Sequence, residues 1–413
     1  MGVAGAVHKI QDSGVVDICA SPASYFNRPP GGQAVHRGVH SSFGLRGMLW
    51  FTEEDTRTSL SDPGNWSRWS QAFDSNESSS MLKRDFAKTL TGYNWAWWFE
   101  NTRTDRWHDD PLLLKTHSRL QEIFRHAFNL GLERTAEIAL LTSEKSIFYT
   151  DHESLRDMLM WQRQLEFDRV GAPADHYYVR DLSHPEMPDY KLYVFLNAIC
   201  LDNQDRRAIE AKIFAKGASA LWLWAPGLIN PDSNPRLSAK HMEELTGFEF
   251  GFITGRFYPK IAIDNPRHPL VHGLPRDRWY GQPDRVMYGS FETREPHQLN
   301  ELEGSLVDPL FYLTDSDQVA GGYFHSSGLP SGLGALGDNR DAGYHSMYIG
   351  SKYVHAELLR KAAIRSGVHI YSEDGDNFYA DGNFAVIHAR TAGKKSIRFP
   401  DTVSPYELFE NRS

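Results

Sequence analysis

An apolar run that stops abruptly at a cluster of acids is the feature that most constrains this chain. Residues 47–51 are almost entirely apolar, residues 52–55 read Thr-Glu-Glu-Asp, and Arg57 follows. A buried strand of a parallel sheet has this pattern when its carboxyl end opens into a polar pocket. A second aromatic run, residues 95–99, ends in the same way at Glu100. We therefore expect a site at strand ends, where carboxylates and aromatic rings lie together.

The composition argues against one class of binding partner and is compatible with another. The chain has 413 residues, 40% of them hydrophobic and 23% charged, so we expect two or three domains with a large core. The net charge is −9 and no long basic run occurs, which argues against nucleic acid. Aromatic residues make up 13% of the chain. Aromatic faces stack on sugars, but core packing accounts for most of them.

The two cysteines and the hydropathy exclude several other classes. Cys19 and Cys200 both lie in apolar runs that are typical of buried strands, so neither a disulfide framework nor a metal site is expected. No run reaches 18 apolar residues, and the first residues lack the pattern of a signal peptide. We expect a cytoplasmic protein with no membrane contact and no cofactor.

Residues 1–131 alternate between strand and helix signals, which favours part of a (β/α) barrel. We expect strands at 15–20, 45–51 and 93–99, and helices at 78–89 and 111–130. Residues 132–246 continue as a βαβ series, which favours an open parallel sheet. Its predicted strands are 136–141, 177–180, 190–199 and 220–225, and its predicted helices are 154–170 and 202–216.

The remainder completes the second domain and adds a third. Residues 247–343 carry short β-like runs rich in Gly, Pro, Asp and Asn, which predict an irregular β-rich insertion within a domain spanning 132–367. A strand at 344–350 and a helix at 351–366 should complete the open sheet. Residues 368–413 hold short strands, including 384–389, and predict a small β-sandwich.

Three segments give the chain a resemblance to a known family. Residues 16–25, with Arg28, Pro29 and Gly31, are similar to a sixth barrel strand and its loop. Leu49 and Trp50, followed by Glu53 and residues 55–58, are similar to a seventh strand that carries a nucleophile. Residues 97–99, with Trp107 beyond, are similar to an eighth strand. In this order they resemble glycoside hydrolase family 42 and its β-galactosidase-like relatives, over nearly the whole chain.

The resemblance implies a fold and an assembly. It implies part of a (β/α)8 TIM barrel, then a flavodoxin-like or glutamine-amidotransferase-like domain that mediates trimerisation, then a small C-terminal β-domain. Strands one to five, and the acid/base glutamate that the family places after the fourth, have no counterpart in the chain. Residues 46–48 read Arg-Gly-Met, where close relatives carry His-Gly-Lys. A homo-oligomer, possibly a trimer, acting on a galactoside-like substrate is implied.

The site residues follow from the strand ends and from the resemblance. A retaining glycosidase needs two carboxyl groups about 5–5.5 Å apart, and Glu53 fits the nucleophile. Arg57 would hold Glu53 ionised by charge pairing. The alternative is that residues 53–55 form a solvated acidic turn. The expected sugar contacts are Tyr25 and Arg28 at the border of the pocket, Trp95 and Trp97 on one face of their strand, and Glu100 at its end.

The second domain raises the alternative of an amidotransferase. An amidotransferase needs a cysteine at a sharp turn between strand and helix, but residues 225–228 at that place contain none. Cys200, at the end of the preceding strand, is better explained as a buried thiol. Two alternatives to hydrolysis stay open: a non-catalytic remnant or oligomerising scaffold that lacks the acid/base half of the barrel, and a sugar-binding module.

Overall fold

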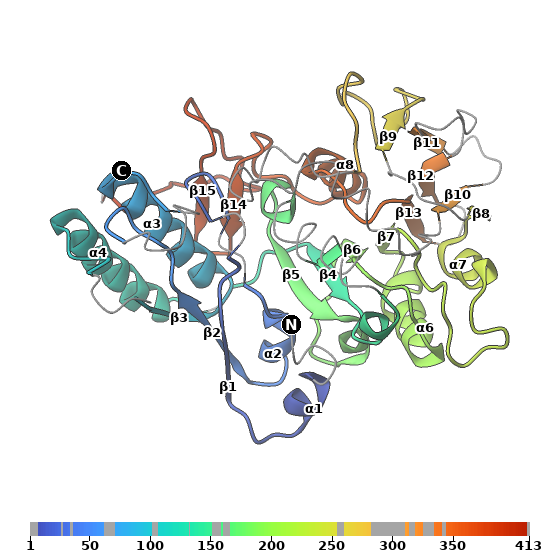
Figure 1. The fold of residues 1–413 in the computed structure, drawn as a ribbon, viewed down its shortest axis with the longest axis horizontal. Coiled ribbons are helices and arrows are strands. Elements are labelled where there is room, and N and C mark those ends of the chain that lie inside the picture. Colours follow the sequence, from blue (N-terminus) through green and yellow to red (C-terminus); the bar gives the residue numbers. More distant parts are fainter. Residues whose placement is uncertain are drawn as a thin grey trace, which may run out of the picture.

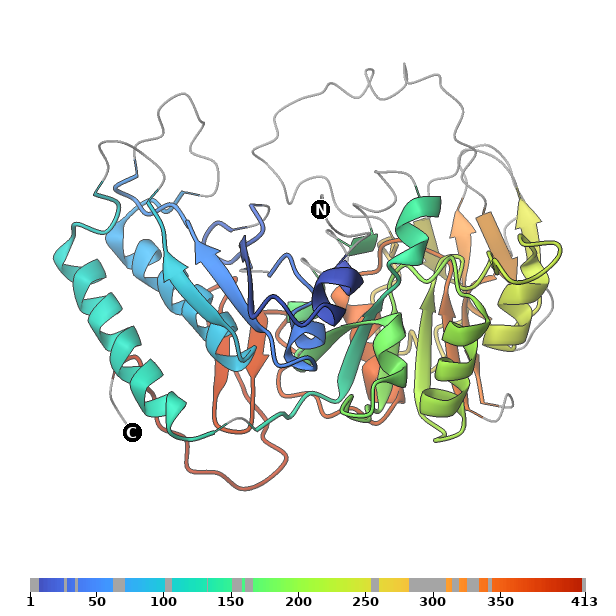
Figure 2. The same cartoon turned by 90° about the horizontal axis from the view of Figure 1, so that it is seen from below.

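The computed structural model describes residues 7–25, 28–33, 36–61, 71–100, 106–131, 133–150, 158–159, 166–253, 260–281, 310–313, 319–324, 334–340 and 344–410. These residues form a small parallel sheet at one end of an elongated molecule and a large mixed sheet at the other (Figure 1). A two-stranded sheet near the C-terminus lies between them (Figure 2). No helix in the described ranges is long and apolar enough to cross a membrane.

The small sheet consists of three parallel strands in the order β1-β2-β3. They are β1 (Ile18–Pro22), β2 (Leu49–Glu54) and β3 (Trp95–Trp98), and their register aligns Pro22, Glu53 and Trp97. Four helices accompany them: α1 (Val7–Asp12), α2 (His40–Gly44), α3 (Ser75–Thr91) and α4 (Pro111–Phe128). The strand-helix alternation expected for residues 1–131 is confirmed, and the three strands are those of the family resemblance.

The predicted boundaries in this region differ from the observed ones by a few residues, most of all at the start of the second strand. The strand expected from residue 45 begins at Leu49, because α2 ends at Gly44 and residues 45–47 form a turn. Gly47 has φ 69°, a left-handed conformation that glycine adopts without steric cost and that ends extended structure. Leu45 is apolar because it packs against the core of the large sheet. In the sequence, it therefore could not be distinguished from the apolar residues of the strand that follows.

Capping explains where the two long helices begin. The Asp74 side chain accepts a hydrogen bond from the Glu77 backbone N–H at the start of α3. The Asp110 side chain accepts from the N–H groups of Leu112 and Leu113, and Pro111 occupies the first turn of α4, where its missing N–H costs nothing. These signals are local, so the sequence located both helices to within a few residues.

The two faces of the small sheet differ in their cover. Side chains alternate along β2, so Trp50, Thr52 and Glu54 share one face and are buried, while the alternate residues share the other and are more exposed. Helices α2 and α3 pack on the buried face. On the open face, Ile18 is 50% exposed and its neighbour Leu49 is 41% exposed. A parallel sheet is usually covered on both faces, but within the described residues the part of this face around Ile18 and Leu49 stays apolar and exposed.

The large sheet contains five parallel strands in the order β5-β4-β6-β7-β13. Numbered along the chain, this order is 2-1-3-4-5, which flavodoxin-like folds share. The strands are β4 (Ile138–Thr142), β5 (Ala174–Tyr178), β6 (Leu192–Phe195), β7 (Ser219–Leu223) and β13 (His345–Ile349). The open parallel sheet expected for this domain is therefore confirmed, with strand ends shifted by a few residues.

The β-rich stretch that was predicted as an insertion extends the same sheet. Strand β12 pairs antiparallel with β13, and further antiparallel strands follow. They are β8 (Phe250–Ile253), β9 (Lys260–Ile263), β10 (Leu310–Leu313), β11 (Val319–Phe324) and β12 (Gly334–Asn339). Their short, glycine-rich sequences resembled irregular structure, because long-range pairing leaves no local signal.

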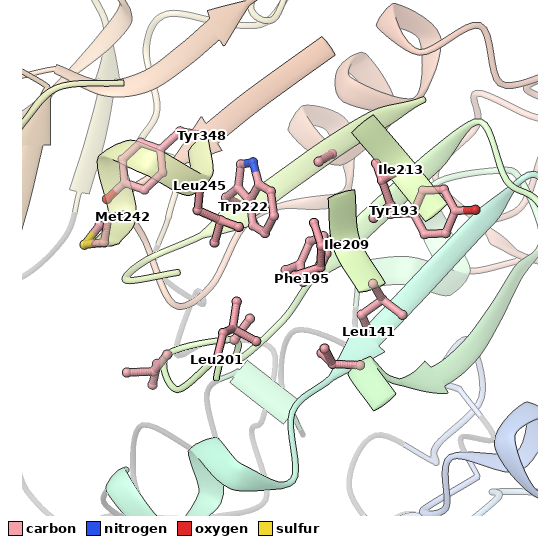
Figure 3. Packing of buried hydrophobic residues seen from close by; sticks show 14 of the residues in the cluster. Leu141, Tyr193, Phe195, Leu201, Ile209, Ile213, Trp222, Met242, Leu245 and Tyr348 are labelled. Carbon is pink, nitrogen blue, oxygen red and sulfur yellow. The ribbon is translucent and has the colours of Figure 1, made fainter. Parts of the chain in front are cut away.

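Helices and an aromatic core support the large sheet. The helices are α6 (Asn203–Ile209), α7 (Ala239–Thr246) and α8 (Ala356–Arg365), and α6 continues as the π-helix Glu210–Phe214. Three 3-10 segments are also present: Lys145–Tyr149, Phe167–Arg169 and Val179–Ser183. Most of the helix predicted at 154–170 lies outside the described residues. Figure 3 shows part of the core, where the Phe195 and Trp222 rings stack with centroids 4.1 Å apart.

The C-terminal region connects the two sheets. Instead of the predicted β-sandwich, the described residues beyond 367 contain one antiparallel pair, β14 (Asn377–Ala380) and β15 (Ala385–His388). The Asn377 side chain donates to the carbonyls of Gly31 and Gly32, next to β1, at 3.1 and 2.7 Å. This region does not require a second sheet to cover its apolar side chains, because some of them pack against α3 and α4. Phe409 is an example.

A close backbone approach at Gly171 gives the first prediction. Gly171 accepts a hydrogen bond from the Tyr371 N–H at 2.8 Å, and an added Cβ would lie 1.7 Å from the Ser372 carbonyl oxygen. We expect Gly171→Ala to lower the free energy of unfolding by about 3 kcal/mol, from left-handed strain plus the clash. Gly217 has φ 65° and open space, so Gly217→Ala should cost about 1 kcal/mol. Urea denaturation measures both, and equal losses would contradict the contact.

Candidate active site at the end of the second strand

Glu53 lies at the carboxyl end of β2, on the open face of the small sheet. It is half-buried and stands between Pro22 of β1 and Trp97 of β3 in the register of the sheet. Register partners in parallel strands point to the same side, so Trp97 shares the face of Glu53, and its ring lies 6.1 Å from the Phe51 ring on that face. The structure thus brings a carboxylate and an indole together at the place that the sequence predicted.

Arg28 anchors the loop that follows β1. Its guanidinium pairs with the Asp55 carboxylate just beyond Glu53 and donates to the carbonyls of Ala23 and Ser24. Only 3% of Arg28 is exposed, so its side chain is a structural part of the site wall. A buried ion pair of this kind is strongly coupled to its surroundings, since removal of either partner leaves an uncompensated charge. Arg28 therefore fixes the loop against the end of β2.

Two guanidiniums hold the Tyr25 ring. The Cζ atom of Arg28 lies 4.7 Å from the centre of the ring, and that of Arg37 lies 4.3 Å from it. Both distances are within the range of cation–π contact. Tyr25 itself is 37% exposed, so one part of the ring faces solvent at the mouth of the site. Arg37 was not predicted from the sequence, because no regular spacing links its loop to Glu53.

The pKa of Glu53 is set by partial burial, by one neighbouring carboxylate and by two neighbouring guanidiniums. Partial burial is the largest influence, and together with the Asp55 carboxylate it raises the pKa of Glu53 above its usual range, although the positive charges of Arg28 and Arg37 act to lower it. The sequence assigned the charge-pairing role to Arg57. In the structure, the cations that influence the Glu53 pKa are Arg28 and Arg37, which approach from the loop after β1. That loop is distant in the sequence, so the pairing depends on the fold.

Behind Glu53, on the covered face, lies a buried charge cluster that the sequence analysis also missed. It contains the carboxylates of Glu54, Asp55 and Asp85 and the guanidiniums of Arg28 and Arg84, each at most 6% exposed. Arg28 pairs with Asp55, and Arg84 pairs with Asp85 at 2.7 Å. Neither Glu54 oxygen has a hydrogen-bond partner within the described ranges. Polar residues amid the apolar positions of α3 were the available signal.

The charges of this cluster balance when one carboxyl is neutral. Two cations face three carboxyl groups, and both cations are already paired. Burial, and then the charge of Asp85, raises the pKa of Glu54 well above its usual range. Glu54 is therefore the group that retains a proton, and it is separated from Glu53 by the plane of the sheet.

The remaining predicted contacts are spread along the open face. Trp95 lies further from the strand ends, where it stacks on Phe51 at 5.8 Å and meets Phe124 of α4 edge-on at 5.3 Å. Glu100 is exposed just beyond β3. Arg57 follows the acidic residues, and its carbonyl accepts from the Ala72 N–H. The structure gathers Glu53, Tyr25, Arg28 and Trp97, and it places Trp95 in a packing role.

The turn that would carry an amidotransferase nucleophile holds a tryptophan. Trp224 follows β7 with φ 61°, the backbone conformation of a sharp turn between a strand and the next segment. The Lys352 ammonium lies 4.4 Å from its ring centre. Cys200 is fully buried, and burial raises its pKa to about 11, which disfavours the thiolate. These features support the rejection of glutaminase chemistry.

Comparison with known proteins places the fold. No protein-family model and no curated sequence matches the chain. A β-galactosidase from Rahnella sp. R3 superposes with TM-score 0.56 at 12% identity, over 89% of this chain and 54% of its own. Gan42B, a GH42 β-galactosidase from G. stearothermophilus represented by a catalytic mutant, superposes with TM-score 0.57 at 12% identity, over 91% and 53%.

A third structure gives the same result. A β-galactosidase from the psychrophilic Marinomonas ef1 superposes with TM-score 0.54 at 12% identity, over 92% of this chain and 57% of its own. The chain therefore shares the fold of these enzymes along nearly its whole length and spans about half of theirs. This confirms the family resemblance at the level of the fold.

The proton on Glu54 leads to a prediction about pH. The unfolded chain releases this proton near the usual glutamate pKa of about 4.3, but the folded chain retains it. The contribution of Glu54 to stability is therefore fully present below that value and falls as pH rises above it, by at most about 1.4 kcal/mol per pH unit. Glu54→Gln keeps the shape and removes the ionisation, so its stability relative to wild type should rise from pH 5 to pH 8.

Urea denaturation at several pH values measures this difference. Glu186→Gln is the matched control, because Glu186 is exposed and its substitution should leave the pH dependence unchanged. A constant difference between Glu54→Gln and wild type across this range would show that Glu54 is ionised in the folded protein.

Proposed function

We propose that this chain carries the nucleophile half of a β-galactosidase-like retaining glycoside hydrolase, with Glu53 as the nucleophile. The observation that carries the proposal is the position of Glu53, at the carboxyl end of a parallel strand and beside Trp97. Functional residues of (β/α) barrels gather at this end of the strands. The shared fold with β-galactosidases supports the same assignment.

The surroundings of Glu53 suit attack on a sugar. Its carboxylate would attack the anomeric carbon and form a covalent glycosyl-enzyme intermediate, which water then hydrolyses. The positive charges of Arg28 and Arg37 favour the ionised form that attack requires, and they oppose the partial burial that raises the Glu53 pKa. Trp97 offers an apolar face for the C–H groups of the sugar ring, and Tyr25 lies at the mouth, where its hydroxyl interacts with Asp55. The Arg28–Asp55 pair would hold these groups in place.

The reaction also needs a second carboxyl group that acts as the acid/base. A retaining enzyme places its acid/base about 5–5.5 Å from the nucleophile. The nearest described carboxyls do not suit the role, since Asp55 is paired with Arg28 and Glu54 lies on the other face. Glu100 is exposed beyond β3. Hydrolysis should therefore favour substrates whose leaving groups depart without protonation, unless another polypeptide segment supplies the acid.

Hydrolysis of nitrophenyl galactosides tests the role of Glu53. We expect Glu53→Gln to reduce turnover by roughly a thousandfold or more, the scale at which loss of a nucleophile acts. Glu186→Gln should have no effect. Azide should restore activity to Glu53→Gly and yield a glycosyl azide of inverted configuration, because a small anion fills the space of the lost carboxylate. Equal turnover by wild type and Glu53→Gln would remove Glu53 from the mechanism.

A non-catalytic scaffold is the second proposal, and the open face of the small sheet favours it. Ile18 and Leu49 expose apolar surface next to unpaired strand edges, which promote association. If the chain assembles through this face, replacing both residues by serine should shift light-scattering mass toward the monomer. Leu237→Ser is the control, since Leu237 is 60% exposed on the other domain. An unchanged mass distribution in the double variant would exclude this face.

A further inference from the structure

A separate cavity of about 60 Å³ lies where the two sheets and the C-terminal strand pair meet. Its walls include Lys88 and Tyr93 from the end of α3, Asp168 and Asp175 from the large domain, and Tyr379 from β14. Glu53 does not line it. The cavity has room for roughly four to six water-sized groups, at about 10–15 Å³ each.

The charges around this cavity are already matched. The Lys88 ammonium lies 2.7 Å from Oδ1 of Asp168, and the Arg134 guanidinium lies 3.1 Å from Oδ2 of Asp175. An anion placed here would face two carboxylates, and a cation would face two positive groups. Both arrangements would break or oppose an existing pair. The walls therefore suit an uncharged ligand.

Polar atoms in the walls have unused hydrogen-bonding capacity, among them the Tyr93 hydroxyl and Oδ2 of Asp168. The Tyr93 hydroxyl is buried and has no partner in the part of the chain that the structure describes. The Oδ2 atom of Asp168 accepts no hydrogen bond of good geometry there, although the Tyr379 hydroxyl is near it. Buried groups of this kind are usually satisfied by water or by a ligand. One can donate or accept and the other accepts, which matches a hydroxyl group of a ligand.

The backbone at Tyr93 is strained in a way that directs its side chain. Tyr93 has φ 55°, in the left-handed region, although Gly92 directly before it would adopt that conformation at no cost. Bulky residues rarely hold such a conformation, and those that do are concentrated at functional sites. In this conformation the Tyr93 ring lies against the Arg134 guanidinium at the wall of the cavity. The Cζ atom of Arg134 is 5.3 Å from the centre of the ring.

We propose that this cavity binds a small uncharged polyol of three or four carbons. The matched ion pairs supply polar walls without net charge, and the aromatic residues Tyr93 and Tyr379 supply apolar surface. Because the walls come from three parts of the chain, a bound polyol stabilises their junction. The site is independent of Glu53, so it stands or falls separately from the hydrolase proposal.

Erythritol and glycerol are the probes, and saturation-transfer NMR titration measures their binding to the whole chain. Tyr93→Phe removes one hydrogen bond and should weaken erythritol binding about three- to tenfold. Thr91→Met places a longer side chain in the cavity and should abolish binding. Tyr149→Phe is the matched control, because Tyr149 is 55% exposed and lies outside the cavity walls. Circular dichroism verifies that each variant is folded.

Three results would overturn the assignment. The first is equal erythritol affinity in wild type, Tyr93→Phe and Thr91→Met. The second is a crystal soaked in erythritol whose cavity contains water alone. The third is displacement of the polyol by inorganic phosphate or ammonium at comparable concentration, which would show that the site selects charge. Erythritol density in contact with the Tyr93 hydroxyl, lost in Tyr93→Phe, would establish the site.

Discussion

The small sheet depends on the buried ion pairs behind Glu53. Arg28 joins the loop after β1 to Asp55 at the end of β2, and Arg84 of α3 pairs with Asp85 and donates to the carbonyls of Arg28 and Pro29 at 2.8 and 3.1 Å. Breaking a buried pair by removing one partner typically costs about 3–5 kcal/mol. The loop that carries Tyr25 and the strand that carries Glu53 are therefore held in one geometry, which a catalytic or binding site requires.

This arrangement separates two neighbouring glutamates by function. Glu53 lies on the open face, where partial burial raises its pKa but the positive charges of Arg28 and Arg37 act against that rise. Glu54 lies on the covered face, where burial and Asp85 favour its protonated form. Alternation of side chains along a strand is the cause, since adjacent residues enter different environments. A carboxyl that attacks and a carboxyl that packs can thus be adjacent in sequence.

The same sheet is incomplete as a structural unit. Its open face exposes Ile18 and Leu49, while related folds of about twice the length superpose on nearly the whole chain. Polypeptide that covers this face would also be placed to complete the chemistry around Glu53. The hydrolase and scaffold proposals therefore share one physical question, namely what packs on three strands whose other face is already buried. The large sheet has no such need, because its core is closed by its own helices and antiparallel strands.

Local signals in the sequence determined much of this protein. The two long helices α3 and α4, the apolar run ending at Glu53, and the βαβ series of the large domain were all readable, because each depends on residues close together in the chain. Tertiary structure decided the rest: that Arg28 and Arg37 rather than Arg57 act on Glu53, that Glu54 and Asp85 share a buried cluster, that strands β8 to β12 extend the main sheet, and that the C-terminal strands form a pair rather than a sandwich. Burial and long-range pairing set the charge state and the partner of each group, and neither leaves a periodic pattern in the sequence.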